Sequence, residues 1–110
     1  MTDRELLELA AKAAGYVSHG YGELCGGSPS LYLQEADFTG IWSPLTDDGD
    51  AQRLAVKLGL QIVHYSVTSK GPDRVSAGRN GSPIPYGKDP YAATRRAITR
   101  AAAEIGKAMP

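Results

Sequence analysis

The sequence predicts one domain of the α+β class: a three-layer α/β/α sandwich with three helices and a small, mainly antiparallel sheet. Three segments have apolar residues at helical spacing next to residues that cap helices, and the segments between them alternate apolar and polar residues as strands do. The chain has 110 residues, of which 42% are hydrophobic and 22% charged. This size and composition fit one modest core.

The first helix is expected over about residues 3–14. Thr2 and Glu5 have the spacing of a capping box, in which each side chain bonds a free backbone N–H at the helix start. Gly15 fits just past the end of this helix. Its apolar face is predicted to consist of Leu6, Leu9, Ala10 and Ala13.

The acidic segment "TDDGD" has two interpretations, a metal-binding loop and a helix start. A calcium loop needs a distant bidentate glutamate, and the following "AQRLAVKLGL" contains no carboxylate. As a helix start, Asp47 is the cap, while Asp48 and Asp50 lie in the first turn, where the helix dipole favours negative charge. We therefore predict a second helix that Gly59 ends, and no metal site.

The third helix begins at Pro90, with Asp89 as its N-cap. Small side chains on its buried face allow a close approach of this helix to the sheet. That face is predicted to consist of Ala93, Ala97, Ala101 and Ile105, with Ile98 and Ala102 beside them.

Four segments are predicted to be strands. Residues 31–36 and 38–42 form a hairpin, and residues 74–78 pair back on residues 60–68. The segment 60–68 is rich in β-branched and aromatic residues and is apolar on both faces near its start, which favours a central position in the sheet. Residues 16–30 are predicted to be a loop with at most a short edge strand, and residues 79–88 an irregular loop.

Bulk properties exclude some classes of function. The twelve basic and twelve acidic residues cancel, which argues against nucleic-acid binding through overall charge. No apolar run approaches the roughly 20 residues that span a bilayer, and the N-terminus lacks the apolar core of a signal peptide. The lone Cys25 has no partner for a disulfide or a zinc site, so we expect a cytoplasmic protein without a cofactor.

The candidate ligand-binding residues are aromatic rings in glycine- or proline-rich segments, together with arginines, because rings stack on bases and guanidinium groups bind phosphate. The alternative is that the rings cover the core and that the arginines form a solvated helix face, with Arg100 and Glu104 as an ion pair. For Trp42 we favour the core. The candidates are Tyr16, His19, Tyr21, Trp42, Arg74, Arg79, Tyr86, Arg95 and Arg96.

Signals of catalysis are weak. His64 lies in the strongest predicted strand, where a structural histidine is more common than a catalytic base. No motif of a serine hydrolase, zinc protease or phosphate-binding loop is present. Nothing near Cys25 in the sequence would lower the pKa of its thiol.

Two blocks resemble a known family. "W-x-P-L-x-D-D-G-D-A-x-R-L-A-V-K-L" (residues 42–58) and "A-T-R-R-A-I-x-R-A-A-A-E-I-G" (residues 93–106) resemble the phage ABA sandwich domain, found in small proteins of tailed bacteriophages and prophages. The resemblance implies helices on both sides of a central sheet. It implies no established chemistry and no catalytic residue.

The leading hypothesis is a phage accessory protein that binds without turnover and sequesters a nucleotide-type immune signal, such as a cyclic dinucleotide or an ADP-ribose derivative. A homo-oligomer is expected, with the pocket between subunits, because one small domain has little room for a cavity of roughly 300 Å³ or more. The alternatives are an inhibitor that docks on a host protein through residues 16–30, nucleic-acid binding by the last helix, and a small nucleotide hydrolase that uses His64. No contact with a membrane is expected.

Overall fold

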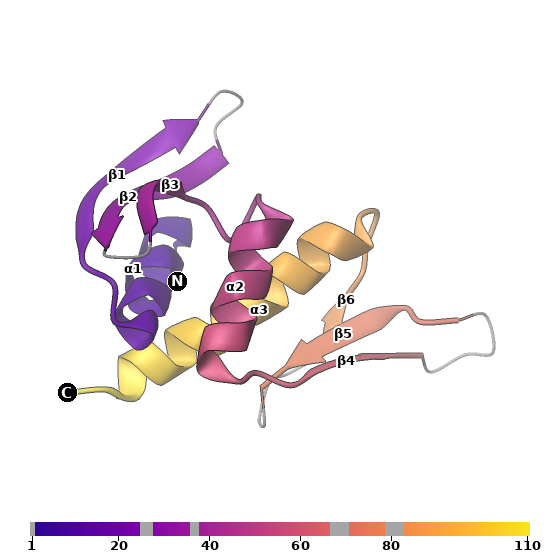
Figure 1. The fold of residues 1–110 in the computed structure, drawn as a ribbon. Helices are drawn as coiled ribbons and strands as arrows, with labels where there is room; N and C mark the ends of the chain where they lie inside the picture. Colours follow the sequence, from indigo (N-terminus) through magenta and orange to yellow (C-terminus); the bar gives the residue numbers. More distant parts are fainter. Residues whose placement is uncertain (1, 25–27, 36–37, 67–70, 79–82) are drawn as a thin grey trace.

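The computed structural model describes residues 2–24, 28–35, 38–66, 71–78 and 83–110 (Figure 1). Within these ranges the chain forms three helices and six strands, and the α+β class is confirmed. The elements are α1 (Asp3–Ala14), β1 (Ser18–Leu24), β2 (Ser28–Glu35), β3 (Phe38–Trp42), α2 (Asp48–Leu58), β4 (Ile62–Tyr65), β5 (Arg74–Ala77), β6 (Ile84–Pro85) and α3 (Pro90–Ala108). No helix of the described part is long and apolar enough to cross a membrane.

The strands belong to two sheets, each an antiparallel meander of three strands in the orders β1-β2-β3 and β4-β5-β6. Figure 1 shows the sheets at opposite ends of the molecule, with α2 and α3 between them. The prediction of one central sheet covered by helices on both sides is therefore wrong in its layer order. In each sheet, the strands that pair are neighbours in the sequence. The two sheets are therefore local units, and α2 lies between them in the chain.

The predicted helix ends are confirmed. The Thr2 hydroxyl accepts a hydrogen bond from the Glu5 backbone N–H, and the Asp47 carboxylate accepts one from the Asp50 N–H at 2.8 Å. Asp89 accepts hydrogen bonds from the N–H groups of Tyr91 and Ala92. These caps are local in sequence, because each side chain bonds a backbone group two or three residues away.

Strand placement differs from the prediction in three places. The segment 16–30 contributes the whole of β1, a seven-residue edge strand, and the start of β2. Ile84–Pro85 forms β6 on the edge of the second sheet, where a proline costs no ladder hydrogen bond. With β6 beside it, β5 is the central strand and β4 lies on the edge. The apolar start of the β4 segment is explained by Leu60 and Ile62, which both pack on the core.

The core surrounds α3, which packs on α1, α2 and β5. Two helices approach each other closely at Gly106 of α3 and Leu9 of α1. A Cβ atom at Gly106 would lie 2.9 Å from the Leu9 carbonyl carbon and closer still to its oxygen. The predicted approach of α3 to a sheet is also present, since a Cβ at Gly78 would lie 3.4 Å from the Ala101 methyl group.

Gly106→Ala is expected to lower the free energy of unfolding by about 2 kcal/mol, because a methyl group must push α1 away from α3. This cost exceeds the gain of about 1 kcal/mol that alanine has over glycine within a helix. Urea denaturation followed by circular dichroism measures the change.

Gly22→Ala is the matched control, because a Cβ at Gly22 meets no atom within 4 Å. It is expected to change stability little. Equal stability of Gly106→Ala and the wild type would show that this contact does not limit the packing of α1 on α3.

A candidate binding site between α2, α3 and the second sheet

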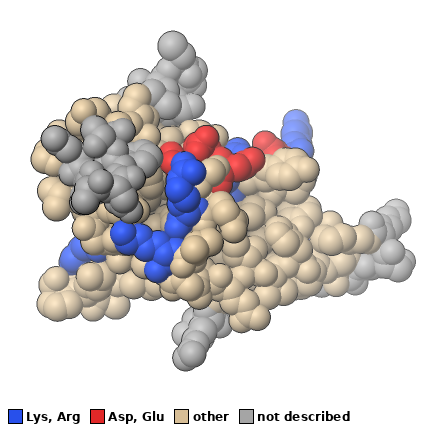
Figure 2. Space-filling view, viewed as in Figure 1, with Lys and Arg blue, Asp and Glu red and all other residues tan. Residues whose placement is uncertain are grey.

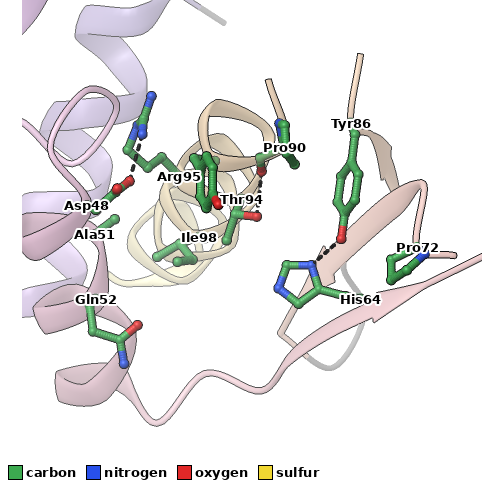
Figure 3. Close-up of a pocket in the computed structure, with 11 residues that line it drawn as sticks. Asp48, Ala51, Gln52, His64, Pro72, Tyr86, Pro90, Thr94, Arg95 and Ile98 are labelled. Carbon is green, nitrogen blue, oxygen red and sulfur yellow. Dashed lines mark hydrogen bonds and ion pairs between the residues drawn. The ribbon is translucent and has the colours of Figure 1, made fainter. Parts of the chain in front are cut away.

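A pocket of about 590 Å³ lies where α2 and the first half of α3 face β4 and the residue after β6 (Figure 3). Ligand sites commonly have volumes of 300–1,000 Å³, so one chain provides enough room without a second subunit. Ala51 and Ile98 form its apolar floor. The other lining residues are Asp48 and Gln52 of α2, His64 of β4, Pro72, Tyr86, and Pro90, Tyr91, Thr94 and Arg95 of α3.

His64 and Tyr86 form the aromatic wall of the pocket. The Tyr86 hydroxyl lies 2.7 Å from His64 Nδ1 in a hydrogen bond, and the ring centroids are 5.9 Å apart at an angle of 59°. The Tyr86 backbone N–H also donates to the Asp73 carbonyl oxygen, which anchors the chain after β6. Both rings are therefore oriented by hydrogen bonds (Figure 3).

Arg95 lies between α3 and the start of α2. Its Nε donates to the Leu45 carbonyl oxygen at 3.0 Å, and its Nη1 lies 2.6 Å from the Asp48 carboxylate. Only 16% of the Arg95 side chain is exposed. The guanidinium charge is thus offset by Asp48, and Arg95 offers the pocket an ion pair and not a free cation.

Gln52 follows Asp48 by one turn on α2 and is exposed at the pocket. Within the described ranges its amide has no hydrogen-bond partner, so it can still donate and accept. The Thr94 hydroxyl donates to the Pro90 carbonyl oxygen. Its oxygen accepts no hydrogen bond from a described residue, so it can accept one from a ligand. The side of the pocket opposite the aromatic wall therefore has hydrogen-bonding capacity for a ligand.

The start of α2 is fixed by a polar cluster of Ser43, Asp50 and Arg53. Asp50 is buried, accepting from the Ser43 backbone N–H at 2.9 Å and from Arg53 Nη2 at 2.7 Å. The hydrogen bond to Asp50 raises the pKa of Arg53 above its ordinary value. This cluster holds the helix that carries Asp48 and Gln52. Among described residues, no group of three His, Cys, Asp or Glu side chains is placed to hold a metal ion.

Of the eight candidate residues that the structure describes, the pocket contains Tyr86 and Arg95. Tyr16 packs edge-on against buried Trp42 at 5.8 Å, with Lys57 over its other side, so the core interpretation of Trp42 is confirmed. Tyr21 lies under the Arg4 guanidinium, and His19 is exposed on β1. These aromatic residues belong to the half of the molecule that holds the first sheet.

The other two candidate arginines in the described part of the chain, Arg74 and Arg96, do not line the pocket. Arg74 pairs with its neighbour Asp73 at 3.2 Å, and Arg96 pairs with Asp3 of α1 at 3.1 Å. Arg79 lies outside the described residues, as does Cys25. The acidic side chains visible in Figure 2 gather around the start of α2.

Sequence reasoning missed Gln52 and Tyr91 as pocket residues. Helical spacing is the sequence feature that could have indicated them. Asp48 and Gln52 lie one turn apart on α2, and Tyr91 and Arg95 lie one turn apart on α3. That spacing places each pair on one face of its helix. It does not show that the two faces meet, which depends on the packing of α2 on α3.

Comparisons with models of protein families, with curated proteins and with solved structures gave no match. The resemblance to the phage family therefore rests on the two sequence blocks.

Arg95→Gln is expected to lower the free energy of unfolding by about 1.5–3 kcal/mol, because hydrogen bonds to a largely buried charged group are lost. Arg96→Gln is the control, since its ion pair with Asp3 is exposed and contributes about 1 kcal/mol or less. Urea denaturation of both variants measures the difference. Equal losses would contradict the structural role assigned to Arg95.

Proposed function

We propose that this protein is a non-catalytic binding protein that captures a nucleotide-type small molecule in the pocket between α2, α3 and the second sheet. One observation carries the proposal: the hydrogen-bonded rings of His64 and Tyr86 lie across the pocket from α2, where the Gln52 amide has no hydrogen-bond partner among the described residues. A planar heterocycle needs this combination, because its faces stack and its edge forms hydrogen bonds.

The base is the part of the ligand that the pocket fits. Tyr86 and Tyr91 offer ring faces, and a glutamine amide such as that of Gln52 matches the donor and acceptor on the edge of adenine. The hydrogen bond to His64 orients the Tyr86 ring before any ligand arrives, which lowers the entropic cost of binding.

In this proposal, the phosphate of the ligand contributes less to the binding affinity than the base does. Among the described residues, Arg95 is the one arginine that lines the pocket, and Asp48 already offsets its charge. A nucleoside is therefore expected to retain most of the affinity of its nucleotide, and added salt is expected to weaken binding only slightly.

Binding is favoured over hydrolysis by the surroundings of His64. Its side-chain hydrogen bond within the described ranges goes to the Tyr86 hydroxyl. A catalytic histidine would need an orienting carboxylate and an adjacent nucleophile. The hydrolase alternative gains no support from this arrangement.

The resemblance to the phage family extends the proposal to infection. A phage protein that holds a cyclic dinucleotide or an ADP-ribose derivative in the host cytoplasm lowers its free concentration and so blocks the defence that it activates. This step rests on the two matching sequence blocks and on the pocket together.

Calorimetric titration with cyclic dinucleotides, ADP-ribose derivatives and their parent nucleosides tests the pocket. Tyr86→Ala is expected to weaken binding about 5- to 150-fold, since stacking on one ring contributes about 1–3 kcal/mol. Tyr86→Phe keeps the ring and loses the hydrogen bond to His64, so it should bind more tightly than Tyr86→Ala.

Tyr32→Ala is the control, because Tyr32 is exposed on the first sheet, away from the pocket. The proposal fails if no member of the panel binds, or if Tyr32→Ala and Tyr86→Ala weaken binding equally.

The infection step is tested by expressing the protein in bacteria that carry a defence based on a nucleotide signal. The wild-type protein is expected to restore plaque formation by a sensitive phage, and Tyr86→Ala is expected not to, because it releases the signal. Equal plaque counts with and without the wild-type protein would refute the role in anti-defence while leaving the calorimetric result intact.

A further inference from the structure

A second concavity, the α3 groove, lies beside the C-terminal half of α3. Its volume is about 960 Å³, and among described residues it shares no lining residue with the candidate site. Leu58 at the end of α2, Leu60 in the connection to β4 and Ile84 of β6 contribute apolar surface. From α3 it is lined by a stripe at helical spacing: Ala97, Ala101, Ile105 and Ala108.

The C-terminal part of this stripe is open to solvent, whereas Ala97 is buried and Ala101 is partly buried against the core. Ile105 is 39% exposed and Ala108 is exposed, although both lie on the longest helix of the described chain. The described C-terminus does not fold into the groove, because Lys12 Nζ donates to the Met109 carbonyl oxygen and holds the chain end against α1. An apolar helix stripe of this kind matches a partner helix.

The charges at the groove show which partner fits. Arg100 and Glu104 both line it, one turn apart, and within the described part of the chain neither has an ion pair or a hydrogen bond. In α1, Arg4 and Glu8 have the same spacing and close an ion pair at 2.8 Å. The predicted Arg100–Glu104 pair is thus not formed, and both charges are available to a partner.

We propose that the α3 groove is the interface between two copies of this chain, related by a two-fold axis that passes the exposed face of α3 midway between Arg100 and Glu104. In this arrangement the two α3 helices are antiparallel. Arg100 then faces Glu104 of the partner subunit, and Glu104 faces Arg100 of the partner subunit. A two-fold interface requires such self-complementarity, which one basic and one acidic residue placed about the centre of the stripe provide.

Packing supports the same geometry. Ala108 is small and exposed, so the C-terminal part of α3 allows a close approach, and Ile105 of each copy can fill the groove of the other. The chain has no net charge, so two copies meet no overall repulsion. The candidate site stays outside this interface, so the proposal does not depend on the proposed function.

Charge exchange tests the proposal by sedimentation equilibrium and multi-angle light scattering. The wild-type protein is expected to be a dimer. Arg100→Glu alone and Glu104→Arg alone each place like charges opposite one another and are expected to raise the dissociation constant about tenfold or more. The double variant R100E/E104R restores opposite charges and is expected to dimerise again.

Mixing the two single variants gives the sharpest result. Arg100→Glu has two acidic residues at the groove and Glu104→Arg has two basic ones, so the mixture is expected to form a heterodimer from two weakly associating proteins. Native mass spectrometry detects it when one variant is labelled with ¹⁵N.

Ile105→Asp adds a test of the apolar contact and is expected to give a monomer. Val56→Asp is its control, because Val56 is 70% exposed on α2 and outside the groove, and it is expected to stay dimeric. Circular dichroism verifies that all variants are folded. A monomeric wild type, a mixture that stays monomeric, or a folded Val56→Asp monomer would each overturn the proposal, whatever the ligand titrations show.

Discussion

The contact of Gly106 with the backbone of Leu9 is the constraint on which the arrangement of the molecule depends. It allows α1, with the first sheet, to lie directly against α3, and α3 also carries α2 and β5 on its other sides. Buried alanines such as Ala102 and Ala103 continue the close packing along the helix. Because small residues occupy these faces of α3, one helix serves as the core of both halves. The surfaces left over on α3 are those that line the pocket and the α3 groove.

The pocket depends on a second constraint, the polar cluster at the start of α2. Asp50 is 5% exposed, and both of its oxygens are occupied, by the Ser43 N–H and by Arg53. The Ser43 hydroxyl in turn donates to the Pro29 carbonyl oxygen of β2. A buried carboxylate is tolerated only when it is satisfied in this way, so the cluster fixes the angle at which α2 leaves the first sheet. That angle determines where Asp48 and Gln52 stand relative to the aromatic wall.

The parts of the fold that could be predicted from sequence are those decided within a few residues. Thr2, Asp47 and Asp89 bond backbone groups next to them, so their helices began where the sequence indicated. The layer order could not be predicted, because Gly106 is important only through its approach to Leu9, nearly a hundred residues earlier. The site shows the same division. Helical spacing in the sequence indicates that Gln52 lies on the same face of α2 as Asp48. The contact between His64 and Tyr86 could not be predicted in this way, because it depends on the pairing of β6 with β5.

Arginines were the least informative part of the site prediction, and the reason is electrostatic. In a chain with equal numbers of acidic and basic residues, most guanidinium groups find a carboxylate nearby, as Arg74, Arg95 and Arg96 do. Such pairs position helices but leave little free charge for a phosphate. In both proposals, recognition is carried instead by the groups whose capacity is unused. In the described chain these include the amide of Gln52 at the pocket and the charges of Arg100 and Glu104 at the α3 groove. Each lies beside apolar surface, where a hydrogen bond or an ion pair gains strength because water is excluded. Unused polar capacity beside apolar surface, and not the number of arginines, is therefore the feature on which both proposed binding surfaces rest.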